Sequence, residues 1–248
     1  MEDLQLLVNA VYLLAAVAFL LGLRLMAQPA SAQRGRFIAA IGFLSALIVT
    51  LMDVRIERFE YVLGGLGIGA FAGMRMARLS SANNFLPTLA SFNGFGGLAC
   101  LLVAWAEFLA HPAGQGISGG AALASTVVLG SISLAGSAAL WARLEKKTSF
   151  ANPKNYVTLR YSLAALAAAA LISAGLFSAD TVAPEAGRYL ALSAVFALIL
   201  SVLWLFSLQS ADSAAGLSLL SGITGLAVGA AGFVFQNVLL VAVGALAG

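Results

Sequence analysis

Long apolar segments separated by short polar breaks dominate the chain. Apolar residues in these segments are continuous rather than alternating with polar ones, so the pattern predicts helices rather than strands. A helix that crosses about 30 Å of hydrocarbon needs about 20 residues, and the segments are close to that length. We predict nine membrane spans, at residues 5–26, 36–52, 61–79, 86–109, 119–142, 157–177, 187–208, 213–232 and 234–248. The predicted fold class is therefore all-α: a polytopic transmembrane helix bundle, formed by a single domain over residues 1–248.

Basic residues gather on one side of the predicted membrane. Lys and Arg in short loops stay on the cytoplasmic side. With nine spans and the N-terminus outside, ten of the thirteen Lys and Arg residues fall in inner loops or at inner helix ends. Only Arg55, Arg58 and Arg188 fall outside. This split predicts an outer N-terminus and a cytoplasmic C-terminus.

Composition narrows the function classes. The chain is 61% hydrophobic and 9% charged, whereas soluble domains carry about 25% charged residues. An ordinary globular enzyme, a disordered protein and a nucleic-acid-binding protein are excluded. The single cysteine, Cys100, and the single histidine, His111, rule out a disulfide framework, a multi-cysteine metal site and a histidine cluster. We expect no metal site in this chain.

The fourth and eighth predicted spans share a pattern at an offset of 128 residues. The residues Leu89, Gly94, Gly97, Leu98 and Ala99 recur as Leu217, Gly222, Gly225, Leu226 and Ala227. Four spans separate the two copies, so both run in the same direction, as in transporters built from parallel repeats. Five identities among small and apolar residues also fit chance. Both readings stay open.

The polar side chains predicted to lie within the membrane are neutral ones. Asn93 precedes a run of glycines in span four, and Ser221 and Thr224 occupy the matching region of span eight. Span five carries Ser125, Thr126, Ser131, Ser133 and Ser137. Helix packing explains such hydroxyls, because they can bond back to the preceding turn. An amide in hydrocarbon needs partners for two donors and an acceptor, and with water it can relay a proton without carrying charge. The candidate proton pathway is Asn93, Ser221, Ser133 and Thr224.

Two ionisable residues lie near the outer end of span four. Glu107 and His111 are a candidate outer mouth of a proton or ion path, since ionisable groups within membranes are commonly functional. The alternative is a pair of solvated groups in the outer interface.

A glycine-rich stretch in span three imitates a dinucleotide fingerprint. Gly65, Gly67 and Ala70 have the spacing of that fingerprint, but the fingerprint requires a strand, a turn and a helix N-terminus. Within an apolar span, Gly65, Gly69 and Gly73 form a small-residue packing face instead. We find no nucleophile array, metal cluster or phosphate loop, and expect neither catalytic residues nor a cofactor site in this chain.

Several local strings resemble the beta subunit of the proton-translocating NAD(P) transhydrogenase. The most specific is Leu86-Pro87-Thr88-Leu89 leading to Asn93-Gly94-Phe95-Gly96-Gly97. The others are Gly22-Leu23-Arg24-Leu25-Met26, Gly136-Ser137 with Arg143-Leu144, and Thr224-Gly225-Leu226-Ala227-Val228-Gly229 with Gly232-Phe233 and Asn237. They occur in the family's order across nearly the whole chain. The family's membrane domain is also a nine-span unit with an outer N-terminus.

The resemblance implies a function and a setting. In that enzyme, hydride passes between NAD and NADP on soluble domains and is coupled to protons crossing the membrane domain. Asn93 matches a fourth-span residue of the proton path that is histidine in some members and asparagine in others, and Ser221 matches an eighth-span polar residue. The implied partners are an alpha-type subunit and a separate NADP-binding domain, of which the 248 residues contain no counterpart. A truncated chain and a membrane unit recruited to an unrelated complex are the alternatives to a separate domain. The implied location is the bacterial inner membrane.

Three functions remain open at this stage. The first is a proton-translocating membrane subunit of a transhydrogenase-type complex, with the basic stretch from Arg143 to Lys154 as either an orientation signal or a docking surface. The alternative is a non-catalytic membrane scaffold in an unrelated respiratory or photosynthetic complex. A small-solute transporter built on the parallel repeat is the third.

Overall fold

The structure is a computed structural model, and it describes residues 2–26, 28–51, 59–80, 85–111, 116–145, 156–207 and 213–247. Within these ranges every regular element is a helix, and none is a strand, which confirms the all-α fold class. The helices are α1 (Glu2–Met26), α2 (Ala32–Leu51), α3 (Phe59–Leu79), α4 (Phe85–Ala110), α5 (Gly116–Leu144), α6 (Tyr156–Ala179), α7 (Ala186–Ser207), α8 (Ser213–Val234) and α9 (Val238–Ala247). Each corresponds to one predicted span and differs from it by a few residues at either end.

Six of the described helices are long and apolar enough to cross a membrane, namely α2, α4, α5, α6, α7 and α8. The helix α9 has only 10 residues, or about 15 Å of length, half the hydrocarbon thickness. The helix α3 carries Glu60, Arg75 and Arg78. The chain is therefore a multi-pass membrane protein, while the count of nine spans and the outer N-terminus stay predictions.

The chain divides into two compact units, Met1–Arg75 and Met76–Gly248. In the first unit α1 and α2 form a hairpin held close by small residues. A β carbon placed on Gly22 would lie 2.6 Å from Cβ of Ala39, and one on Gly42 would lie 2.8 Å from the carbonyl oxygen of Ala15. Larger side chains at these glycines would force the two helices apart.

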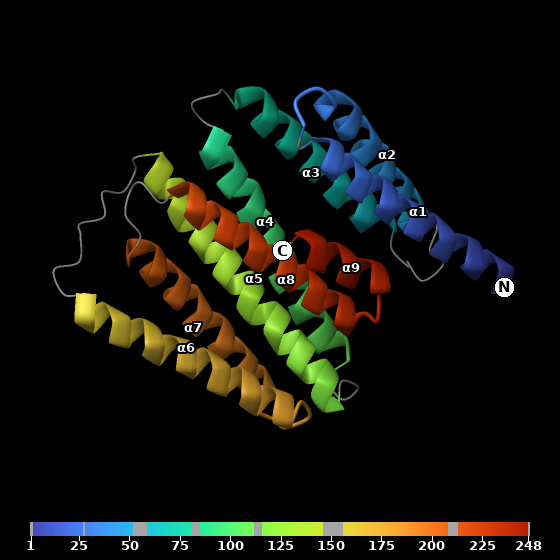
Figure 1. The fold of residues 1–248 in the computed structure, drawn as a ribbon. Helices are drawn as coiled ribbons and strands as arrows, with labels where there is room; N and C mark the ends of the chain where they lie inside the picture. The colour runs from blue at the N-terminus through green and yellow to red at the C-terminus, as the bar shows by residue number, and fades with distance from the viewer. Residues whose placement is uncertain are drawn as a thin grey trace. The chain divides into compact units, whose positions relative to one another are not determined.

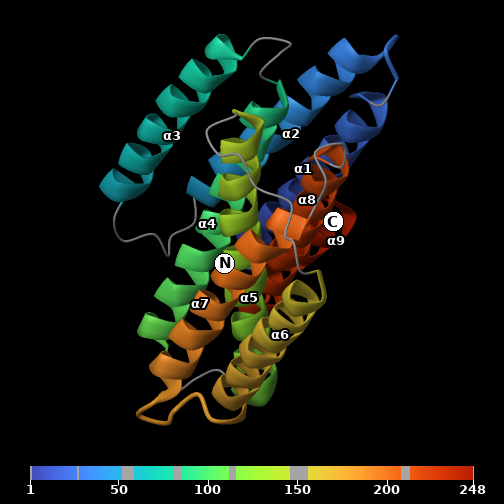
Figure 2. The same ribbon diagram turned by 90° about the vertical axis from the view of Figure 1, so that its left-hand side faces the viewer.

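The second unit is built around α5 (Figure 1), against which α4, α6, α7 and α8 all pack. In its most apolar stretch, 61% of α5 is buried inside the fold, compared with 39% for α8, the next most buried helix. The helices α6 and α7 form a pair joined at one end of this unit, as Figure 2 shows. The polar residues that the sequence places on α5 therefore lie at the centre of the unit.

A tight turn separates α8 from α9. The Asn237 N–H donates to the Gly232 carbonyl at 2.8 Å, and the Gln236 N–H donates to the Phe233 carbonyl at 3.2 Å. This is the Schellman pattern that ends helices, with Gln236 in the left-handed conformation (φ 51°) that glycine usually supplies. The eighth and ninth predicted spans are thus two separate helices, α8 ending at Val234. The ninth helix begins at Val238 rather than at residue 234, because the turn takes up the intervening residues.

Candidate functional site

The amide of Asn93 lies where α4, α5 and α8 meet. Its Nδ2 donates to Oγ of Ser137 at 2.9 Å and to Oγ of Ser133 at 3.3 Å. Its Oδ1 accepts a hydrogen bond from Oγ1 of Thr224 at 2.9 Å. Both donors and the acceptor of the amide are therefore satisfied by hydroxyls on two neighbouring helices, as an amide in an apolar bundle requires.

The hydroxyls of this network have more acceptors than hydrogens. Oγ1 of Thr224 has three acceptors in reach: Oδ1 of Asn93, the carbonyl of Leu220 at 2.9 Å, and Oγ of Ser133. Ser133 in turn contacts the backbone carbonyl of Asn93 at 3.4 Å. A hydroxyl carries one hydrogen, so rotation can switch which of Ser133 and Thr224 donates to the other. The Asn93 amide keeps one direction, because its Nδ2 only donates and its Oδ1 only accepts.

Glycines on α4 create the space for this network. A β carbon on Gly97 would lie 2.7 Å from the Leu134 backbone nitrogen and 2.8 Å from the Gly130 carbonyl oxygen. One on Gly94 would lie 3.2 Å from Cβ of Ser137, and one on Gly96 would lie 3.2 Å from Cγ2 of Thr224. Small residues thus let the backbones approach until short side chains bridge them.

Burial differs across the network. Ser133 and Ser137 are fully buried on α5, whereas Asn93 and Thr224 are half-buried. The network therefore extends from the centre of the second unit to the seam between α4 and α8, which pack against each other and run in the same direction.

Three of the four predicted pathway residues come together, and Ser221 lies apart from them. Its side chain is exposed on α8, three positions before Thr224. The residue that sequence reasoning left out of the pathway is Ser137, which accepts the shorter of the two Asn93 donor bonds. Its spacing of four from Ser133 places both hydroxyls on one helix face, and this was the available signal.

Other hydroxyls of α5 behave as packing predicts. Ser125 and Thr126 bond back to the carbonyls of Ala121 and Ala122 at 2.7 and 2.8 Å. Ser131 is buried, and its Oγ has no hydrogen-bond partner. From α7, Ser201 donates to the Ile132 carbonyl at 2.6 Å, which ties α7 to α5 next to the network.

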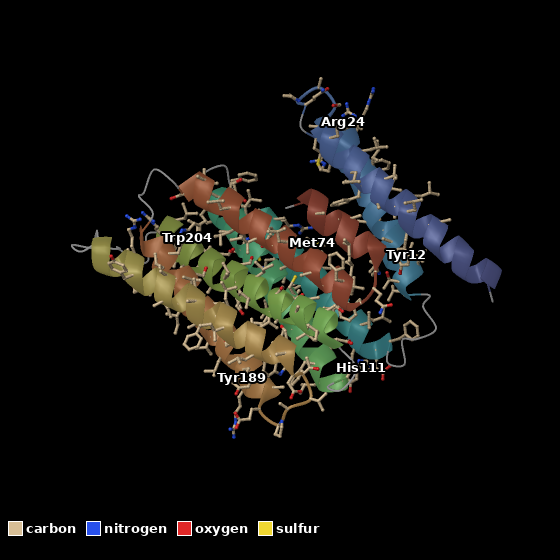
Figure 3. All side chains as sticks on the ribbon, turned by 60° about the horizontal axis from the view of Figure 1, so that its bottom comes forward. Tyr12, Arg24, Met74, His111, Tyr189 and Trp204 are labelled. Carbon is tan, nitrogen blue, oxygen red and sulfur yellow. The ribbon has the colours of Figure 1, made fainter. Side chains whose placement is uncertain are left out.

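The candidate outer mouth is a cavity at the far end of the second unit. Nδ1 of His111 lies 3.0 Å from Oε1 of Glu107, and their side chains are 65% and 18% exposed. They line a cavity of about 470 Å³ together with Ser118, Gly119, Ala122, Phe233, Val234 and Gln236. Figure 3 shows His111 at the opposite end of this unit from Trp204.

This cavity lies well away from the Asn93 network along α4. Glu107 follows Asn93 by fourteen positions on α4, or about 21 Å along the helix. Ala104, Leu123 and Val127, at levels between the two, belong to a buried apolar cluster with Phe177, Ala186 and Leu190 of α6 and α7.

The described residues do not fit a dinucleotide. The glycines Gly65, Gly67 and Gly69 lie in the interior of α3, and no strand precedes them in the described part of the chain. Added β carbons at these positions meet nothing within 4 Å. The described residues around these glycines lack the fingerprint geometry of a strand, a turn and a helix N-terminus. The stretch is helix interior, but no described residue packs against Gly65 or Gly69, so the small-residue packing face predicted from the sequence has no partner at these two positions. Among the described residues there is also no group of three metal-ligating side chains.

Comparison with known families identifies the chain. The model of the NAD(P) transhydrogenase beta subunit matches residues 8–248. The chain belongs to this family. It is similar to the "NAD(P) transhydrogenase subunit beta" of Rhodospirillum rubrum, and to the protein of the same name from a named strain of that species, with 28% identity over 247 residues in both cases. The match covers 96% of this chain and 52% of each relative. The chain thus spans about half the length of the curated relatives it matches.

Membership of the beta subunit family confirms the resemblance seen in the sequence. The family is the membrane part of a proton-translocating complex, and the six apolar helices agree with that setting.

Proposed function

We propose that this chain is the proton-conducting membrane subunit of an NAD(P) transhydrogenase-type complex in the bacterial inner membrane. The observation that carries the proposal is the Asn93 amide, satisfied by three hydroxyls from two helices at the centre of a membrane bundle. NAD and NADP bind to partner domains, and hydride transfer takes place there. The partners are an alpha-type subunit and an NADP-binding domain.

The proposed relay uses neutral groups. Asn93, Ser133, Ser137 and Thr224 contain no titratable side chain, so a proton passes by hydroxyl rotation and through water admitted at the half-buried side of the network. In the arrangement described, the Asn93 amide is saturated, and the Glu107–His111 cavity lies about 21 Å away along α4. Conduction therefore requires a second arrangement of α4 against α5, which the nucleotide domains would select by binding it more tightly.

The test of this assignment is purification of the tagged chain from its native membrane in mild detergent, followed by mass spectrometry of the co-purifying proteins. Recovery of NAD- and NADP-binding transhydrogenase partners is the expected result. Recovery with an unrelated membrane complex and without a nucleotide-binding partner would favour the scaffold function. The scaffold function is supported by the same network, in which every hydrogen-bonding group of the Asn93 amide has a partner and no group is charged. Such a network also holds helices together.

The proposed relay predicts different effects for substitutions of Thr224 and Ser221. Thr224→Val keeps the side-chain shape but leaves Oδ1 of Asn93 without its donor. We expect coupled proton transfer to fall about tenfold, the equivalent of one lost hydrogen bond. Ser221→Ala removes an exposed hydroxyl outside the network and is expected to change little. Proton uptake by liposomes containing the complex measures both, and a larger loss in Ser221→Ala would contradict this relay.

The outer location of the Glu107–His111 cavity can be tested by cysteine labelling. In a Cys100→Ala background, Ser118→Cys places a thiol on the exposed cavity wall, and Ala214→Cys places one at the opposite end of the second unit. We expect a membrane-impermeant maleimide to label residue 118 in intact cells. Residue 214 should be labelled only after permeabilisation. The reverse pattern would overturn the predicted orientation.

A further inference from the structure

An apolar groove of about 210 Å³ lies on the second unit beside the Asn93 network, and no residue of the network lines it. Its walls come from α6, α7 and α8, and its floor includes α5. The residues that line it are Ile132, Leu163, Leu200, Ser201, Trp204, Leu219 and Ile223. The hydroxyl of Ser201 already donates to the Ile132 carbonyl. A molecule bound in the groove would therefore contact aliphatic side chains and the Trp204 ring. Leu219 remains 54% exposed, so the groove is open to the surroundings of the bundle.

Two arginines lie at one end of this groove. Arg160 precedes Leu163 by three positions on α6, so both side chains share a helix face, and Arg160 is exposed one turn nearer the start of α6. Arg143 follows Ile132 by eleven positions on α5, or about three turns. Its Nη1 donates to the Leu205 carbonyl at 3.3 Å, beside Trp204.

The charge at this end is positive. The one acidic side chain there among the described residues is the exposed Glu145, since the others of the second unit, Glu107, Asp180 and Glu185, belong to the opposite end. Tryptophan is enriched where hydrocarbon meets the polar headgroups. Trp204 precedes Leu205, whose carbonyl accepts the hydrogen bond from Arg143, and Figure 3 shows Trp204 at the end of the unit opposite His111. The groove thus has apolar walls, then a tryptophan, then two guanidinium groups. A phospholipid has the same order, with its acyl chain, its interfacial region and its charged phosphate.

We propose that this groove binds an anionic phospholipid such as phosphatidylglycerol. An acyl chain of this lipid lies against Leu163, Leu219 and Ile223. Its phosphate pairs with the Arg160 guanidinium, at the end of the groove where Arg143 also lies. Guanidinium groups bind phosphate oxygens in a planar, two-pronged geometry, and basic pockets between membrane helices on the cytoplasmic side bind anionic headgroups. The site is separate from the proposed proton relay, and it stands whether or not the chain conducts protons.

The test uses Trp204 as a contact probe. The full chain with Trp105→Phe and Trp141→Phe keeps one tryptophan, and brominated acyl chains quench tryptophan fluorescence on contact. We expect brominated phosphatidylglycerol in mixed liposomes to quench Trp204 at lower mole fraction than brominated phosphatidylcholine, and unlabelled phosphatidylglycerol to reverse the quenching. Arg160→Gln should reduce this preference about fivefold, the effect of one basic residue on anionic lipid binding.

The matched control is Arg188→Gln, which removes an exposed arginine at the other end of the second unit, where it pairs with Glu185 at 3.2 Å. It should leave the preference unchanged. Equal quenching by the two lipids, or equal effects of Arg160→Gln and Arg188→Gln, would overturn the proposal. Native mass spectrometry of the chain with all three tryptophans gives an independent readout: fewer retained phosphatidylglycerol molecules in Arg160→Gln than in Arg188→Gln support the site, and equal numbers reject it.

Discussion

Asn93→Leu is expected to abolish proton transfer coupled to hydride transfer, with a loss of about 100-fold or more, the usual contribution of a positioned proton-transfer group. Leucine is close in size but neither donates nor accepts. It would leave Ser133, Ser137 and Thr224 without the amide that joins them. The measurement is proton uptake by liposomes that contain the complete complex, driven by the nucleotide reaction and followed with a pH-sensitive dye.

Asn93→His is the matched control for this experiment. Histidine occupies the corresponding position in some members of the transhydrogenase family, and its ring can donate to one neighbour and accept from another. We expect this variant to retain much of the coupled transfer. If Asn93→Leu couples as well as the unmodified complex, the proton assignment fails and the network is a structural lock between helices.

Gly97→Ala is expected to destabilise the second unit by about 2 kcal/mol, within the range for overpacked cores. The added β carbon would lie 2.7 and 2.8 Å from backbone atoms of Leu134 and Gly130. Backbone atoms in two helices cannot move aside as a flexible side chain can, so α4 and α5 must separate. Unfolding in a detergent titration followed by circular dichroism measures the loss. Because Asn93 lies one turn away on α4, coupled proton transfer should fall as well.

Gly65→Ala provides the contrast within the same chain. Nothing in the structure lies within 4 Å of a β carbon at this position, and alanine is favoured over glycine in helices by about 1 kcal/mol. This variant should be as stable as the unmodified chain or slightly more so. If the two alanine variants were equally stable, close packing at Gly97 would not hold α4 against α5.

The link between packing and chemistry explains why both effects are large. Gly94, Gly96 and Gly97 set the separation of α4 from its neighbours, and that separation is what lets side chains as short as serine and threonine reach the Asn93 amide. A change in either the glycines or the amide therefore disturbs the same few hydrogen bonds.

The local order of the sequence was sufficient to predict the helices. Apolar runs of membrane length and the polar breaks between them predicted all nine described helices to within a few residues, because a backbone in hydrocarbon must satisfy its own hydrogen bonds and does so as a helix. The same reasoning identified Asn93 as a buried amide in need of partners. It did not settle how many helices cross the membrane, since α1, α3 and α9 are not among the six long apolar helices: α3 carries charges, α9 is short, and the apolar part of α1 is Ala10–Met26.

Tertiary structure decided which polar residues meet. Ser221 and Thr224 lie three positions apart on α8 and look equally suitable in the sequence, yet only Thr224 reaches Asn93, while Ser221 is exposed. Ser137 joins the network although the sequence placed it among five similar hydroxyls on α5. Residues three positions apart differ by about 60° around the helix axis and about 4.5 Å along it, which is enough at the edge of a buried face for one side chain to reach Asn93 while the other stays exposed. The face that each helix turns inward depends on how its glycines pack against other helices, and this is a property of the assembled bundle.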